Sequence, residues 1–291
     1  MKKTYIISIL FAVLLAVGIF ACTSIKNEEE ESIISPELKA QIEQVGIFHN
    51  QGLDAVLVDL LKETRQLTAE SHFSKEHLAN YDFNTLVYST TRRMVKNWYP
   101  TLNDEYLEAV MSNPYLQRYN CSTRSASDEN EQDLKEVLSP FQLEYYNKLL
   151  KIVNTEGITL DRLKAEVLIL EAQIEKEAPS VSEAEVLLCA TSVARYSSEY
   201  WEQNIDVWAT VLFSEMEDSF DKDIETRKWS WNLFAKEDIV GAVSGAIGGA
   251  AAGFFLGGIS VGAGLLAGGV SVGVCNSATY ALGQLWDWIW N

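Results

Sequence analysis

The sequence contains few of the residues from which metal and cofactor sites are usually built. Its 291 residues include three histidines and four cysteines. His72 and His77 lie five positions apart, which on a helix points their two rings away from each other. A zinc site needs three or four converging ligands, and no second cluster supplies them. The sequence therefore predicts no metal site and no cofactor.

Signature motifs of common enzymes give no support for an active site. The chain has no glycine loop that ends in Gly-Lys-Ser/Thr. The letters Gly-x-Ser-x-Gly occur at 258–262 and 269–273, but inside the glycine-rich tail and without the strand-turn-helix context that a nucleophile elbow needs. In "GIFHNQGLD", Gly46 and Gly52 bracket His49. This favours a buried histidine at a helix junction over a general base, because no nucleophile lies nearby in the sequence. We identify no catalytic residue and expect that the chain is not an enzyme.

Basic residues are scarce relative to acidic ones. The chain has 23 Lys and Arg against 41 Asp and Glu, which gives a formal net charge of −18. An excess of negative charge repels nucleic acid, so we predict no nucleic-acid partner. Closely spaced acids such as Glu183 and Glu185 are expected on solvated helix faces. Apart from Cys22, the cysteines are Cys121, Cys189 and Cys275, which allow at most one disulfide.

The N-terminus has the pattern of an export signal. Residues 1–21 begin with Lys2 and Lys3, continue with an apolar run and end at the small residue Ala21. The ending "IFAC" resembles a bacterial lipobox, and this resemblance implies that Cys22 is acylated and becomes the mature N-terminus. An ordinary signal peptide or a simple membrane anchor is the alternative.

Residues 22–34 are predicted to form a solvated, acidic tether. A run of four acids follows one basic residue; these are Lys26, Glu28, Glu29, Glu30 and Glu31. Such a run cannot bury itself. It resembles the acidic export tail of Bacteroidota surface lipoproteins, which implies an outer-membrane location on the cell surface. The alternative is a polar spacer on a lipoprotein that faces the periplasm.

Residues 35–217 are predicted to form an all-α domain, followed by a linker at 218–238. Helix-start signals recur at Ser35-Pro36, Ser139-Pro140 and Thr159. Apolar residues then recur at helical spacing, and no alternating strand pattern competes with them. The aromatic-rich segment around Trp201 and Trp208 is expected in the core rather than on a ligand-binding surface.

Two phrases of this region carry a further resemblance. "GIFHNQGLD" and "ATSVARYSSEYW" are similar to segments of uncharacterised bacterial lipoproteins that end in a glycine-rich tail. The resemblance covers most of the mature chain, but it implies no particular activity.

Residues 239–291 have a different composition, since no charged residue occurs between Asp238 and Asp287. A glycine recurs at every fourth position in Gly241, Gly245, Gly249, Gly253 and Gly257, and a second small-residue face contains Gly264 and Gly268. On helices, these rows let another backbone approach closely. The sequence therefore predicts a glycine-zipper hairpin of two helices, about 239–256 and about 260–284.

Tryptophans flank this predicted hairpin. A folded-back pair of helices would bring both groups to one level, where tryptophan favours a membrane interface; the residues are Trp229, Trp231, Trp286, Trp288 and Trp290. Each helix is also long enough for a bilayer. Three destinations stay open: a structural pair buried in the α-helical body, a membrane-inserting or self-associating module, and a latent hairpin resembling those of bacteriocins and pore-forming toxins.

Overall fold

The structure is a computed structural model that describes residues 32–69, 81–111, 137–213, 231–256 and 261–290. The chain divides into two units, Met1–Ile33 and Ile34–Asn291. All of the helices described below belong to the second unit. The predicted signal peptide and the charged residues of the tether lie outside the described residues.

The all-α fold class is confirmed. The described residues form eight helices and no strand: α2 (Pro36–Ala69), α4 (Phe83–Trp98), α5 (Asp104–Met111), α8 (Pro140–Val153), α9 (Leu160–Glu177), α10 (Val181–Phe213), α11 (Trp231–Leu256) and α12 (Val261–Trp290).

Local capping explains where several helices begin. Ser139 caps α8 by accepting a hydrogen bond from the Gln142 amide, and the Gln142 side chain accepts one from the Ser139 amide. Thr159 accepts from the Arg162 amide at the start of α9. Capping of this kind satisfies backbone donors that have no partner within the helix. These helix starts therefore depend on residues that are close together in the sequence.

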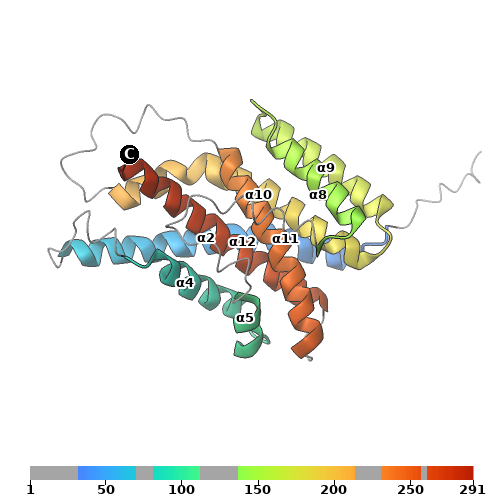
Figure 1. Ribbon diagram of the computed structural model, residues 1–291, viewed down its shortest axis with the longest axis horizontal. Helices are drawn as coiled ribbons and strands as arrows, with labels where there is room; N and C mark the ends of the chain where they lie inside the picture. The colour runs from blue at the N-terminus through green and yellow to red at the C-terminus, as the bar shows by residue number, and fades with distance from the viewer. Residues whose placement is uncertain (1–31, 70–80, 112–136, 214–230, 257–260, 291) are drawn as a thin grey trace, which may run out of the picture. The chain divides into compact units, whose positions relative to one another are not determined.

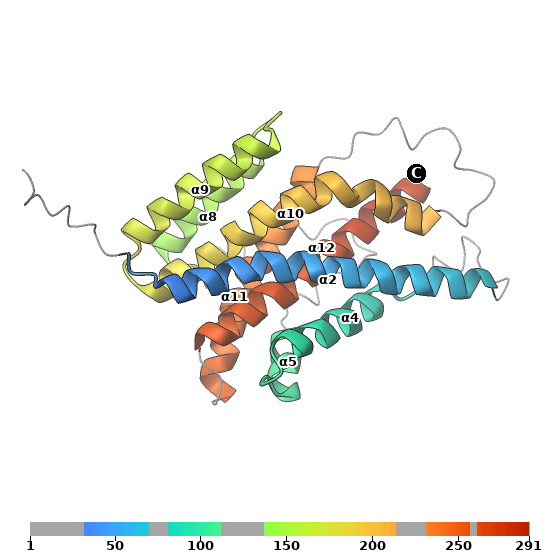
Figure 2. The ribbon, with the colours of Figure 1, turned by 180° about the vertical axis from the view of Figure 1, so that it is seen from behind.

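The hairpin α11–α12 lies inside the second unit. Its two helices pack along each other, and both contact α10, while α12 also packs against α2 and α4. Figures 1 and 2 show the hairpin, in orange and red, beside the long helices α2 and α10. The pair α8–α9 packs on α10, and α4 packs on α2. The hairpin is therefore part of the packed body.

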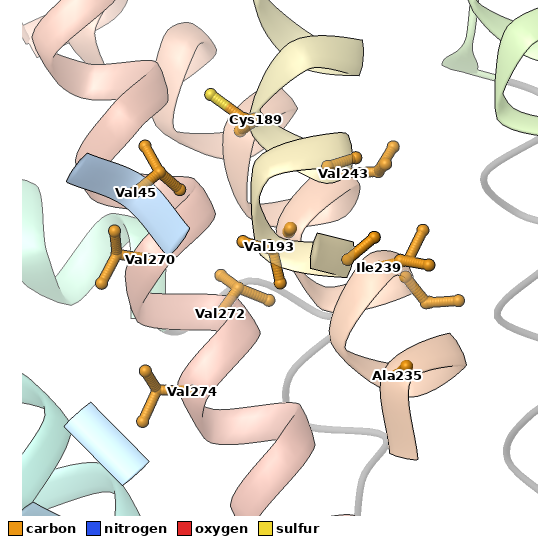
Figure 3. Close-up of a cluster of buried hydrophobic side chains, with 14 of the residues drawn as sticks. Val45, Cys189, Val193, Ala235, Ile239, Val243, Val270, Val272 and Val274 are labelled. Atoms are coloured by element: carbon orange, nitrogen blue, oxygen red, sulfur yellow. The ribbon is translucent and has the colours of Figure 1, made fainter. Parts of the chain in front are cut away.

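Small and branched apolar side chains fill the space between α2, α10, α11 and α12. Figure 3 shows side chains from α2, α10, α11 and α12 converging there; they include Val45, Val193, Ile239, Val243, Val270 and Val272. Each of these six residues has 0% exposure. Burial of apolar surface of this kind is the main stabilising term in folding. The hairpin thus supplies a large part of the core.

Two glycines of the predicted zipper bring α11 against α12. A Cβ atom added at Gly241 would lie 2.9 Å from the carbonyl oxygen of Val272. One added at Gly245 would lie 2.6 Å from the Val272 Cβ and closer still to the carbonyl oxygen of Gly268. No side chain fits at these distances without moving the partner backbone. The close approach depends on glycine at both positions.

The first helix of the hairpin begins earlier than predicted. α11 starts at Trp231, so residues 231–238, which the sequence analysis assigned to a linker, are helical. Glu237 and Asp238 are buried, with 4% and 0% exposure. The predicted helix start at about 239 was wrong because Glu237 and Asp238 were taken to mark the end of a solvent-exposed linker. The packed body and the hairpin also belong to one compact unit, Ile34–Asn291, rather than to separate domains.

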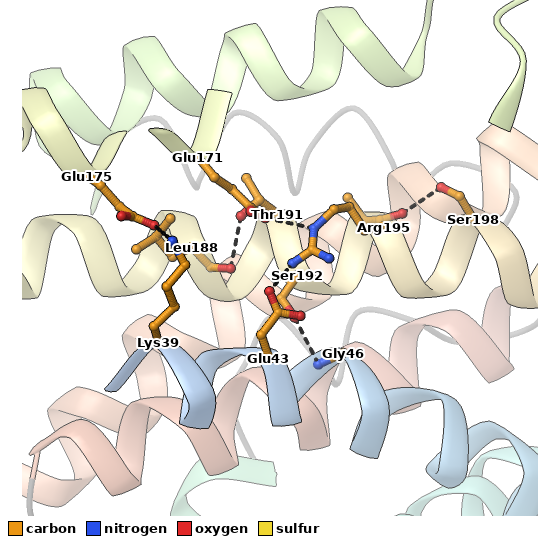
Figure 4. Close-up of polar contacts among 11 residues, drawn as sticks. Lys39, Glu43, Gly46, Glu171, Glu175, Leu188, Thr191, Ser192, Arg195 and Ser198 are labelled. Atoms are coloured by element: carbon orange, nitrogen blue, oxygen red, sulfur yellow. Dashed lines mark hydrogen bonds and ion pairs between the residues drawn. The ribbon is translucent and has the colours of Figure 1, made fainter. Parts of the chain in front are cut away.

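An ion-pair group connects α2, α9 and α10 on one side of the body. Arg195 of α10 pairs with Glu43 of α2, and its Nε lies 2.9 Å from Oε1 of Glu171 on α9. Figure 4 shows this group together with the Lys39–Glu175 pair, which joins α2 to α9 at 2.5 Å. Glu171 has 7% exposure. Charge compensation by Arg195 therefore allows this carboxylate to be buried.

Candidate functional site

Polar side chains from four helices meet inside the apolar core. We call this group the core polar cluster; it consists of His49 of α2, Ser197 and Trp201 of α10, Glu237 and Asp238 of α11, and Ser277 of α12. All six residues have 4% exposure or less. Buried polar groups in proteins are normally paired, so a cluster of this size in a core of valine and alanine needs an explanation.

His49 is positioned by close packing of α2 against the hairpin. A Cβ atom added at Gly273 of α12 would lie 3.1 Å from the His49 Cδ2, so the absence of a side chain there makes room for the ring. His49 Nδ1 lies 3.1 Å from Oδ1 of Asn50, and Asn50 in turn donates to the carbonyl oxygen of Tyr196 at 2.9 Å. His49 is thus buried where α2, α10 and α12 meet, as its flanking glycines suggested.

Asp238 is held by the indole of Trp201. Trp201 Nε1 lies 3.0 Å from Oδ2 of Asp238 and 3.1 Å from Oγ of Ser277. The other carboxyl oxygen, Oδ1, lies 3.9 Å from Nε2 of His49, which is beyond hydrogen-bond distance. Neither of these two atoms has a hydrogen-bond partner among the described residues. The cluster is therefore only partly satisfied.

Burial shifts the protonation equilibria of all three ionisable groups in the cluster. Desolvation lowers the pKa of His49 to about 4. It raises the pKa of Asp238 to about 7, against the hydrogen bonds from Ser277 and Trp201, which lower it. It also raises the pKa of Glu237 to about 7, and repulsion from Asp238 adds to that shift. The interior therefore favours the uncharged form of each group.

Aromatic rings surround the Trp201 side of the cluster. Trp201 lies with its ring centroid 4.8 Å from that of Phe234 and 5.3 Å from those of Tyr200 and Trp208. Trp208 Nε1 donates to the Tyr200 hydroxyl at 3.0 Å. These rings belong to the core, in agreement with the sequence analysis. They keep water away from the carboxyl group and so strengthen its preference for the neutral form.

The core polar cluster can bind and release protons, but its side chains are closed off from solutes outside the protein. His49 and Asp238 both have 0% exposure, so in this conformation a solute outside the protein does not reach them. Among the described residues, no group of three or more His, Cys, Asp or Glu side chains is arranged to hold a metal ion. Cys189 and Cys275 are both buried free thiols, so neither pairs with the other.

The structure describes some of the predicted site residues and leaves others outside its range. Gly264 and Gly268 of α12 are buried, and the Gly264 carbonyl oxygen accepts a hydrogen bond from the Tyr106 hydroxyl at 2.7 Å. Trp231, predicted at a membrane interface, packs partly buried against the core. Outside the described residues or side chains lie Cys22, Lys26, Glu28, Glu29, Glu30, Glu31, Trp229, Gly249, Gly253, Gly257, Trp286, Trp288 and Trp290.

Sequence reasoning missed Glu237 and Asp238 as site residues. They are the last charges before a long uncharged run, and that position was interpreted as the end of a linker. A usable signal was present, because "NLFAKEDIV" has apolar residues on both sides of the acid pair and no Gly or Pro to end a helix. The partner His49 is too far away in the sequence for any local pattern to reveal.

Comparison with known proteins adds no relative from which a function can be transferred. No family model, no curated protein and no solved structure matches this chain.

Proposed function

We propose that this chain is a lipid-anchored protein of the bacterial cell envelope, with a binding or structural role, whose glycine-zipper hairpin forms the core of its α-helical body. Acylation at Cys22 would hold it to the outer membrane, and the acidic tether with Lys26 and Glu28 to Glu31 would direct it to the cell surface. The partners are then the membrane, reached through the lipid, and an unidentified ligand or second copy of the chain.

The burial of α12 is the observation that supports this role for the hairpin. Within the described residues, Gly264–Leu285 is the single stretch that is long and apolar enough to cross a bilayer. Of its most apolar window, 94% is buried against the rest of the chain. A helix that is apolar all round needs a nonpolar environment, and here the neighbouring helices provide it. The stretch Gly264–Leu285 therefore has a nonpolar environment within the protein itself.

Replacing or removing Cys22 tests the anchor and the hairpin together. Labelled fatty acid should enter the wild-type chain and not Cys22→Ala, because the thiol is the acylated atom in the lipobox interpretation. A chain that begins at Thr23, and so lacks both the apolar signal run and Cys22, should leave the membrane fraction and remain soluble without detergent, since its apolar hairpin is enclosed. Acylation that persists in Cys22→Ala would contradict the lipid anchor.

A second candidate function keeps the same fold but gives the hairpin another role. The specific observation is that the longest apolar helix is packed inside a shell of other helices, which is how a soluble domain stores a latent membrane-inserting segment. In that case the protein is similar to a bacteriocin or pore-forming toxin. A chain that begins at Thr23 and still stays with membranes and releases dye from lipid vesicles would support this candidate instead.

A further inference from the structure

The acid pair at the start of the hairpin has no cation to balance it in the described part of the chain. Among the residues that the structure describes, only His49 lies within salt-bridge distance of Asp238, at 3.9 Å, and no ion pair there includes Glu237. The Glu237 Oε2 and Asp238 Oδ1 atoms both lack a hydrogen-bond partner there. Two adjacent buried carboxylates would therefore be costly if both were ionised.

The groups that face this pair come from every helix packed around it. His49 faces Asp238 from α2, and Tyr200 interacts with it from α10. Tyr280 of α12 interacts with Glu237. Burial raises the pKa of Tyr280 to about 12 and that of Tyr200 even further, so both hydroxyls stay neutral at physiological pH. Only His49 and the two acids therefore titrate near neutrality.

We propose that His49, Glu237 and Asp238 form a proton-dependent latch, which holds the hairpin in the body while both carboxyls are protonated and loosens it when they ionise. The latch acts on α11 and α12 together. Asp238 is joined through Trp201 to Ser277 on α12, and His49 lies against the Gly273 backbone of the same helix. Ionisation of Asp238 thus places a charge where all four core helices meet.

The direction of the pH dependence follows from which state binds more protons. Between about pH 4 and 7 the folded chain keeps protons on Asp238 and Glu237, whereas an unfolded chain has released them. His49 has the opposite effect on stability: below about pH 6.5 the unfolded chain binds a proton on this histidine that the folded chain does not. This one proton opposes the two that Glu237 and Asp238 retain in the folded chain. The cluster's contribution therefore weakens as pH rises from about 5 to 7, and is smallest above pH 7.

Denaturant unfolding at several pH values tests the latch, in a chain that begins at Thr23 and so lacks the signal run and Cys22. Each net proton that the folded state retains changes the folding equilibrium about tenfold per pH unit. An Asp238→Asn, Glu237→Gln variant keeps His49, so the parent differs from it by the two acid protons and should lose at least about a hundredfold in folding equilibrium relative to it from pH 5 to pH 7. A matched control is Asp206→Asn, an exposed acid on α10, which should leave the pH slope unchanged.

The reactivity of a buried thiol shows whether the hairpin itself loosens. Cys275 lies on α12 with 7% exposure. With Cys121 and Cys189 replaced by alanine, its maleimide labelling at pH 8 should be several-fold faster when the acids are present than in the Asn/Gln variant. Equal labelling rates, or parental stability that is flat or rises from pH 5 to 7, would overturn the latch. If the variant fails to fold, the parental pH slope alone decides.

Discussion

A Gly245→Ala variant should be strongly destabilised, whereas Gly283→Ala on the partner helix should keep its stability. The new Cβ at Gly245 would lie 2.6 Å from the Val272 Cβ, and closer to the Gly268 carbonyl oxygen. The obstacle is backbone, which cannot rotate away as a side chain would. We expect a loss at or above the upper end of the about 1–3 kcal/mol that overpacking typically costs.

Gly283 provides the matched control for this substitution. It also lies in a helix of the hairpin, but a Cβ added there meets nothing within 4 Å. Alanine is a better helix former than glycine by about 1 kcal/mol, so Gly283→Ala should be neutral or stabilising. Denaturant unfolding of both variants measures the contrast. Equal stability of the two would mean that α11 and α12 do not approach closely at Gly245, and the zipper interpretation would be wrong.

An Arg195→Met variant should lose about 3–5 kcal/mol of stability at neutral pH. Methionine retains most of the length of the side chain but leaves Glu171, with 7% exposure, without its cation. Removal of one partner from a buried ion pair typically has an effect of this size, because the remaining charge is uncompensated. Burial already raises the pKa of Glu171, against the attraction of Arg195. The loss should therefore be smaller at pH 5, where Glu171 can take up a proton.

Arg162 is the control for this second substitution. It pairs with Glu166 on the same helix at 2.7 Å, but its side chain is 64% exposed. An exposed pair of this kind contributes less than about 1 kcal/mol, so Arg162→Met should change stability little at either pH. Thermal and denaturant unfolding compare the two variants. An Arg195→Met chain as stable as Arg162→Met would show that the contacts among α2, α9 and α10 do not depend on this cation.

Sequence patterns predicted the elements of the fold better than their assembly. The starts of α8 and α9 were predicted because Ser139 and Thr159 cap their own helices, and capping is a local interaction. The start of α11 was placed too late, since a buried acid pair contradicts the usual link between charge and solvent exposure. That Glu237 and Asp238 are buried depends on helices from distant parts of the chain.

Composition alone does not decide whether the hairpin is buried in the protein or in a membrane. An apolar helix enclosed by protein and one enclosed by lipid need the same side chains, since both environments exclude water. The glycine row indicated close packing but did not identify the partner. The contacts of Gly241 and Gly245 identify it as α12 of the same chain. α12 also packs against α2, α4 and α10, and its described side chains from Gly264 to Leu285 are mostly buried.

Hydrogen exchange across α12 tests the central claim, that the hairpin forms the core of the body, most directly. The measurement uses the chain that begins at Thr23 in aqueous buffer at about pH 5, where Glu237 and Asp238 are protonated, with and without lipid vesicles. Because Gly264–Leu285 is enclosed by other helices, its amides should be among the slowest to exchange in buffer alone, and vesicles should leave their rates unchanged. Fast exchange in buffer, with protection that develops only when vesicles are added, would contradict the account and place the hairpin in the membrane.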